Sequence, residues 1–227
     1  MGGCCTWLDF LVRTFRTWHL CNTIHLITIQ DEGIPGIPGH RNFSNPTIDA
    51  SFASTIQIFR NLVSLCVQVD CHDEGDHGLC VFKLNNDDVN KLAMALPQLE
   101  WLLLGDPCGE NTCATTIACL LLLSVHCVEL QWLKIHFNTT NIADDLRDIS
   151  ADPRFEELRL LPRGRLSYLD VWQTPLSVNE PDFEAVVNGI IPSLERCDAS
   201  PYNLDWEEVS DRMEELPRTR MLPVYCP

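Results

Sequence analysis

The segment LQWLKIHF, residues 130–137, decides how the chain folds, because it opens with the spacing L-x-x-L-x-I. The same spacing of apolar residues returns along the chain. Its copies are Leu62, Leu65 and Val67; Leu99, Leu102 and Leu104; Leu130, Leu133 and Ile135; Leu166, Leu169 and Val171; and Leu194, Cys197 and Ala199. Successive copies begin 37, 31, 36 and 28 residues apart, and Ile24, Ile27 and Ile29 form an earlier, degenerate copy. This repetition predicts five to six copies of one structural unit.

A helix is predicted in each interval between copies. Residues 48–59 form an amphipathic segment, and polar capping residues precede apolar segments at 86–97, 111–127, 141–149 and 182–191. The copies themselves, such as LVSLCVQV at 62–69, are rich in β-branched residues, which disfavours an all-helical array. Alternating short strands and helices predict an α/β leucine-rich-repeat solenoid. We expect a right-handed, horseshoe-like form with a parallel sheet on its concave side.

The most apolar of these segments is predicted to be a core helix. Residues 117–125 read IACLLLLSV, far short of the ~20 residues that span a bilayer. The whole region 113–127 is expected to be helical and to cover the strand that follows it.

The repeats divide the chain into three parts. Residues 1–58 are expected to form a degenerate repeat or cap that contains a Gly/Pro-rich loop at 31–46. Residues 59–200 hold the leucine-rich repeats, and residues 201–227 form an acidic capping helix and tail.

The charge and the cysteine content limit the expected partners and cellular location of the protein. The net charge is −16, with 16 Lys and Arg against 32 Asp and Glu, so the chain repels phosphate and nucleic acid is not an expected partner. Residues 180–215 contain eleven Asp or Glu and two Arg, a net charge of −9, and this segment is either a solvated face or a surface for a basic partner. The N-terminus lacks the pattern of a secretory signal, so we expect reduced cysteines and a cytoplasmic or nuclear protein.

No motif for catalysis stands in the sequence. It contains no G-x-S-x-G, H-E-x-x-H, C-x-x-C or phosphate-binding glycine loop, and we expect neither enzymatic activity nor a cofactor. The candidates for metal ligands are in the acidic insertion 69–80, which is otherwise an ordinary solvated loop. They are Cys71, His72, His77 and Cys80, whose spacing is not a recognised zinc pattern.

The N-terminus offers a function of another class. Residues 1–6 read MGGCCT, which fits the rule for myristoylation at Gly2, and Cys4 and Cys5 could take palmitate. Two such anchors hold a protein on a membrane. The alternative to a protein-binding module is therefore a membrane-tethered repeat scaffold, and the other reading of this segment is the start of a packed helix.

Residues 59–142 resemble the leucine-rich-repeat region of fungal F-box-type proteins. The resemblance rests on NDDVNKLAMALPQLEWLLLG at 86–105, Pro107-Cys108, a Leu-rich segment ending in His-Cys at 115–127, and LQWLKIHF at 130–137. It implies the substrate-recognition part of a ubiquitin-ligase receptor, with a cullin–adaptor complex as partner if an F-box equivalent exists. Residues 1–58 contain no L-P-x-E opening of an F-box.

Alternation along the strands predicts the binding surface. The third, fifth and seventh positions of each copy point away from the core, and neighbouring strands lie about 4.8 Å apart. The third positions should therefore stand side by side, with polar residues next to them. The residues expected to bind a protein partner on this face are Trp101, Leu103, Trp132, Lys134, His136, Tyr168, Asp170 and Trp172.

Overall fold

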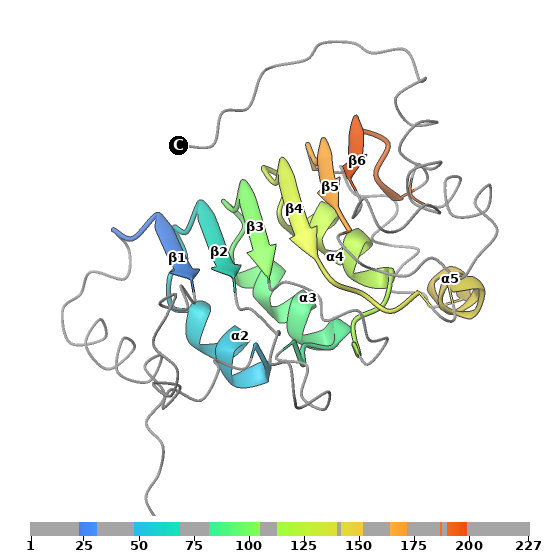
Figure 1. The fold of residues 1–227 in the computed structure, drawn as a ribbon, viewed down its shortest axis with the longest axis horizontal. Coiled ribbons are helices and arrows are strands. Elements are labelled where there is room, and N and C mark those ends of the chain that lie inside the picture. The colour runs from blue at the N-terminus through green and yellow to red at the C-terminus, as the bar shows by residue number, and fades with distance from the viewer. Residues whose placement is uncertain are drawn as a thin grey trace, which may run out of the picture.

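The computed structural model describes residues 23–30, 48–68, 82–104, 113–139, 142–151, 164–171, 187 and 190–198. Strands and helices alternate along this part of the chain (Figure 1). The strands are β1 (Leu26–Gln30), β2 (Ser64–Gln68), β3 (Trp101–Leu104), β4 (Trp132–Ile135), β5 (Tyr168–Asp170) and β6 (Arg196–Asp198). The helices are α2 (Ala50–Ile56), α3 (Asn86–Ala95), α4 (Ala118–His126) and α5 (Ile142–Ala151).

The six strands form one parallel sheet in chain order, β1-β2-β3-β4-β5-β6. Their register aligns the sequence copies residue for residue: Leu65 pairs with Leu102, Leu102 with Leu133, and Leu133 with Leu169. The degenerate copy at Ile27 also forms a strand, and Ile27 pairs with Leu65. The predicted alternation of strand and helix, with parallel strands, is confirmed.

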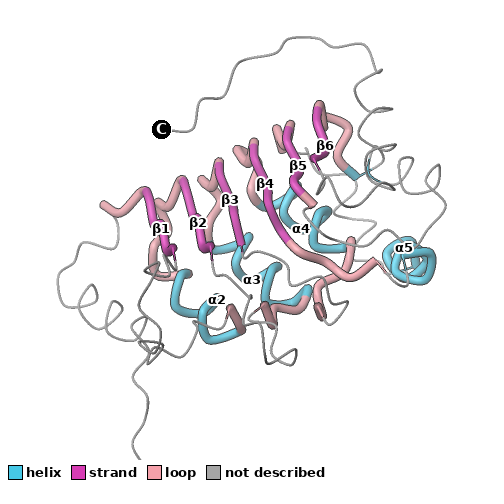
Figure 2. Tube along the Cα trace, viewed as in Figure 1, coloured by secondary structure: helices cyan, strands magenta, loops and turns pink. Residues whose placement is uncertain are grey.

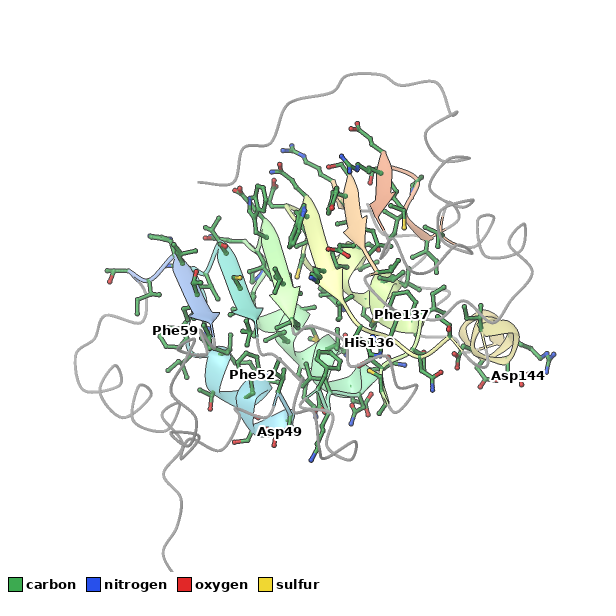
Figure 3. The ribbon with its side chains drawn as sticks, in the orientation of Figure 1. Asp49, Phe52, Phe59, His136, Phe137 and Asp144 are labelled. Atoms are coloured by element: carbon green, nitrogen blue, oxygen red, sulfur yellow. The ribbon has the colours of Figure 1, made fainter. Side chains whose placement is uncertain are left out.

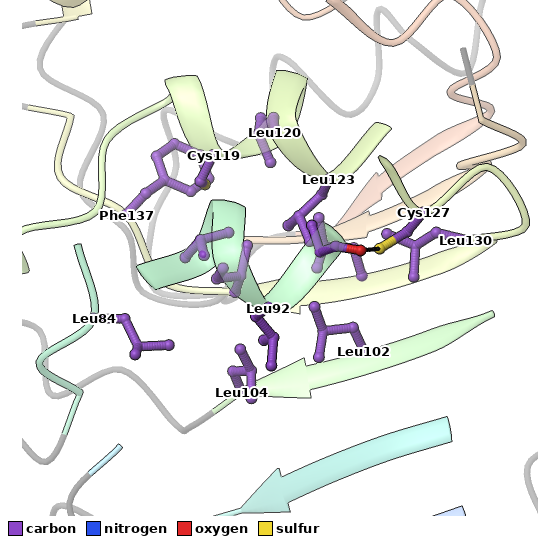
Figure 4. Close-up of a cluster of buried hydrophobic side chains, with 14 of the residues drawn as sticks. Leu84, Leu92, Leu102, Leu104, Cys119, Leu120, Leu123, Cys127, Leu130 and Phe137 are labelled. Atoms are coloured by element: carbon purple, nitrogen blue, oxygen red, sulfur yellow. Dashed lines mark hydrogen bonds between the residues drawn. The ribbon is translucent and has the colours of Figure 1, made fainter. Parts of the chain in front are cut away.

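One face of the sheet packs against the helices (Figure 2). Successive helices from α2 to α5 contact one another, and α2, α3 and α4 lie along this face of the sheet as one layer (Figure 1). Apolar residues at the fourth and sixth positions of the strand copies are buried against this layer, and Figure 4 shows Leu92 of α3 beside Leu102 and Leu104 of β3. The opposite face, which we call the helix-free face, carries no helix of the described residues.

Local capping explains where two helices begin. The carboxylate of Asp49, labelled in Figure 3, accepts hydrogen bonds from the backbone N–H groups of Ser51 (2.9 Å) and Phe52 (3.1 Å) at the start of α2. At α3, the Asn85 side chain accepts from the N–H of Asp88 (3.0 Å), and the Asp88 carboxylate accepts from the N–H of Asn85 (3.4 Å). This capping box satisfies donors that the first helical turn leaves unpaired.

The predicted helix at 113–127 begins later than expected, at Ala118. Residues before it are extended, because Thr116 bridges to Asn138 and Ala114 bridges to Asn85. The Thr115 hydroxyl also donates to the carbonyl of Leu84 (2.7 Å). Through these bonds, residues 114–116 connect neighbouring repeat units. Because their backbone is held extended, the helix cannot begin earlier.

The core helix itself is confirmed. All residues of α4 from Ala118 to Val125 are buried. Its C-terminal end is closed by Gly164, whose N–H donates to the carbonyl of Ser124 (2.7 Å). A Cβ at Gly164 would lie 3.0 Å from the carbonyl oxygens of Ser124 and Cys127, so only glycine fits without a shift of the backbone. Of the helices that the structure describes, none has the length and apolar character that a membrane crossing requires.

Several predictions concern residues outside the described ranges. The loop at 31–46, the capping helix and tail at 201–227, and most of the helix at 182–191 belong to this group. The proposed division into three parts therefore stays a prediction.

Candidate partner-binding surface

The third positions of the copies form one row on the helix-free face. Strand pairing places Ser64 beside Trp101, Trp101 beside Trp132, and Trp132 beside Tyr168. Tyr168 in turn lies beside Arg196, and Leu26 of β1 extends the row beyond Ser64. Each of these residues is followed by an inward-facing core residue, so the alternation of the strand directs the row away from the helices. The predicted side-by-side arrangement is confirmed.

Three members of the row, which we call the aromatic row, stack on one another. The ring centroids of Trp101 and Trp132 lie 5.9 Å apart with planes at 28°, and those of Trp132 and Tyr168 lie 5.4 Å apart at 6°. All three side chains are half-buried. Parallel strands at about 4.8 Å spacing put identical positions within stacking distance, and each aromatic pair contributes about 0.5–1.5 kcal/mol beyond its area burial.

The row ends on a cation at its β6 end. The guanidinium carbon of Arg196 lies 5.6 Å from the centroid of the Tyr168 ring, within the range of a cation–π interaction. One face of the Tyr168 ring therefore meets Trp132 and the other meets Arg196. This contact depends on pairing between strands that lie 28 residues apart in the sequence.

The fifth positions lie on the same face but are more enclosed than the sequence suggested. Lys134 and Asp170 are register partners on β4 and β5, and their charged groups form an ion pair of 3.8 Å. Their side chains are only 11 % and 12 % exposed. Leu103 of β3 is also buried, although it is not part of the main core cluster. Cross-strand pairing explains the burial of the two charges, because each neutralises the other beside the aromatic row.

His136 also differs from its expected position on an accessible surface. It follows β4 directly, and its residue is 2 % exposed (Figure 3). Its carbonyl accepts a hydrogen bond from the thiol of Cys113 (3.4 Å). The backbone of His136 therefore helps to hold the segment before α4 in place, and the buried residue offers little surface to a partner.

The remaining candidates lie outside the described residues. They are Trp172, the metal candidates Cys71, His72, His77 and Cys80, and the lipidation candidates Gly2, Cys4 and Cys5. Within the described residues, no group of three or more His, Cys, Asp or Glu side chains is arranged to hold a metal ion.

Leu26 is a member of the row that the sequence analysis did not select. It is 63 % exposed, more than any other large hydrophobic residue of the described chain. The sequence does place Leu26 in this row: Leu26 occupies the third position of the copy Ile24, Ile27, Ile29, as Trp101 does in its own copy. The weak apolar pattern of this copy hid that equivalence.

Comparison of the sequence with models of protein families and with curated proteins finds no match. The fold and the surface together define an α/β protein with a six-stranded parallel sheet, helices on one face, and a stacked row of aromatic side chains on the other.

Proposed function

We propose that the chain is a non-catalytic leucine-rich-repeat solenoid that binds a protein partner on its helix-free face. The observation that carries this proposal is the aromatic row of Trp101, Trp132 and Tyr168, whose stacked rings are half-exposed on the face opposite the core. Aromatic residues that are not needed to fill a core favour interfaces, because they bury large areas at a small entropic cost.

The solenoid is supported by how the units connect. Among the described residues, strands pair only with their sequence neighbours, and successive helices pack in the same order. A second line of parallel bridges joins Ile48 to Phe82, Asn85 to Ala114, and Thr116 to Asn138. Each unit thus contacts the unit before and the unit after it, which is the organisation of a repeat protein.

The ion pair between the charged side chains beside the aromatic row supports a non-catalytic role. Lys134 and Asp170 pair with each other and are largely enclosed, so neither is presented as a free acid or base. Partner recognition then depends on apolar and aromatic contact, with the ion pair fixing the shape of the surface beside it.

The proposal is tested by removing two rings of the row. Trp132→Ala and Tyr168→Ala should each reduce capture of the partner from cell extract by about ten-fold or more, the size of effect typical of interface hot spots. Met94→Ala is the matched control, since Met94 is 62 % exposed on α3, which lies on the other side of the sheet. Thermal unfolding of each variant is measured separately. Unchanged capture combined with lower stability would show that the rings serve the core alone.

We further propose that the partner is a substrate of a ubiquitin ligase, on the basis of the sequence resemblance of residues 59–142 to fungal F-box-type proteins. Affinity purification of the full chain should then recover the cullin adaptor, and Trp132→Ala should release the substrate but retain the adaptor. Recovery of a partner that depends on Trp132, without any adaptor, would contradict the ligase role and leave the binding role intact.

A further inference from the structure

The two ends of the aromatic row differ in what covers the rings. At the β6 end, Arg196 covers the outer face of Tyr168. At the β2 end, Trp132 covers one face of Trp101, so the other face of Trp101 points back along the row toward Ser64. Among the described residues, no second ring or cation contacts Trp101.

Among the described residues, the neighbours of this ring face along the row are a small side chain and an exposed one. The next member of the row, Ser64, is small, and the one beyond it, Leu26, is 63 % exposed. Two strand spacings of about 4.8 Å separate Leu26 from Trp101. A flat group that stacks on Trp101 above Ser64 fits within this distance, with Leu26 at its other side.

We propose that the partner inserts an arginine side chain at this position, stacked on Trp101 above Ser64. This inference rests on the proposed function and names the chemistry that the helix-free face selects. A guanidinium is flat and cationic, and tryptophan is the aromatic residue that binds cations best. At the other end of the row the chain itself places a guanidinium on an aromatic ring, with Arg196 at 5.6 Å from Tyr168.

Charge selects arginine over an aromatic side chain of similar shape. The chain carries a net charge of −16, so its field attracts basic segments and repels acidic ones. An incoming phenyl ring gains the stacking contact but none of this attraction. The partner segment is therefore basic and presents at least one arginine to Trp101.

The test uses the full chain and a library of displayed random peptides. Selection on the wild-type protein, with counter-selection on Trp101→Ala, should enrich peptides that share an arginine. A selected peptide is then synthesised in three forms, with arginine, lysine or the uncharged isostere citrulline at that position. Citrulline should weaken binding by about five- to thirty-fold, and lysine should weaken it by less.

Ser64→Leu tests the position of the arginine, because it fills the space above Ser64 and keeps all three rings. In this variant the arginine and citrulline peptides should bind equally, while in wild type they differ. Ser64→Thr is the matched control that keeps the residue small. Enrichment of peptides without arginine, or an undiminished preference for arginine in Ser64→Leu, overturns the inference. Trp132→Ala tests the binding surface independently of the arginine. If this variant loses partner capture but no preference for arginine is found, the proposed function stands and only the arginine inference is wrong.

Discussion

Cys127 shows how one residue joins neighbouring units. It follows α4 directly, is fully buried, and its thiol donates to the carbonyls of Leu96 (3.5 Å) and Ala93 (3.6 Å) at the end of α3 (Figure 4). Burial raises the pKa of Cys127 to about 12. The pKa of Cys119 is also raised well above its usual value, first by burial and then by the nearby Cys113. Both thiols pack as small apolar groups.

This burial gives a dependence of stability on pH. The thiol of Cys127 stays protonated in the folded chain to about pH 12 but ionises near 9.0 in the unfolded chain. Its contribution to stability is therefore complete below about pH 9 and is lost as the pH rises toward 12. Urea unfolding should show a free energy that falls more steeply over this range in wild type than in Cys127→Ala. Equal slopes for the two proteins would contradict the buried, protonated thiol.

At the residue scale, the sequence predicted which residues share a row but not how far each is enclosed. Trp101, Trp132 and Tyr168 follow from the period of two along a strand and from the alignment of copies. The burial of Lys134 and Asp170 follows from an ion pair between residues 36 positions apart. Such a pair depends on the register of two strands, and the composition of either strand alone does not reveal it.

Helix α4 is the element on which the fold depends most. It is buried from Ala118 to Val125, whereas α3 has a buried side and an exposed side. A helix that is apolar all round is stable only when it is enclosed on every side. Its neighbours α3 and α5, the buried strand residues that share its core cluster, and the backbone at Gly164 provide this enclosure.

A charge within α4 should therefore strongly destabilise the protein. Leu121 is 1 % exposed, and Leu121→Asp should cost about 3–5 kcal/mol, because the carboxylate gains no partner. Met94→Asp, at a position 62 % exposed in the last turn of the neighbouring helix, should cost about 1 kcal/mol or less, since its carboxylate stays in water and opposes only the helix dipole and helix propensity. Chemical denaturation of both variants measures the difference. Equal midpoints for the two variants would mean that α4 is not enclosed.

The start of α4 shows the limit of prediction at the scale of an element. The sequence indicated a helix from 113, and the structure starts it at Ala118. The delay comes from Asn86, whose side chain donates to the Thr116 hydroxyl (3.0 Å) and accepts from the Thr116 N–H (2.9 Å). These residues lie 30 positions apart, so local propensity could not show that 113–116 are held extended.

At the scale of the whole molecule, the spacing of the copies was sufficient to predict a parallel sheet in chain order. Intervals between 28 and 37 residues exceed the dozen or so residues that a crossover between parallel strands requires, and each interval holds a predicted helix. Successive units then add to one end of the sheet, and all helices must lie in one layer if each unit is to bury its apolar side in the same way. The weak first copy obeyed the same rule, and it places the exposed Leu26 at the edge of the sheet.

The central claim is that partners bind the helix-free face, and site-specific photocrosslinking tests it most directly. The crosslinking residue p-benzoylphenylalanine replaces Leu26, 63 % exposed on that face, or Met94, 62 % exposed on the helix layer, so the two probes are matched in exposure. In cells, the probe at position 26 should crosslink a protein partner, and Trp132→Ala should abolish that crosslink, while the probe at position 94 should give none. A partner crosslinked from position 94 and not from position 26 would contradict the account.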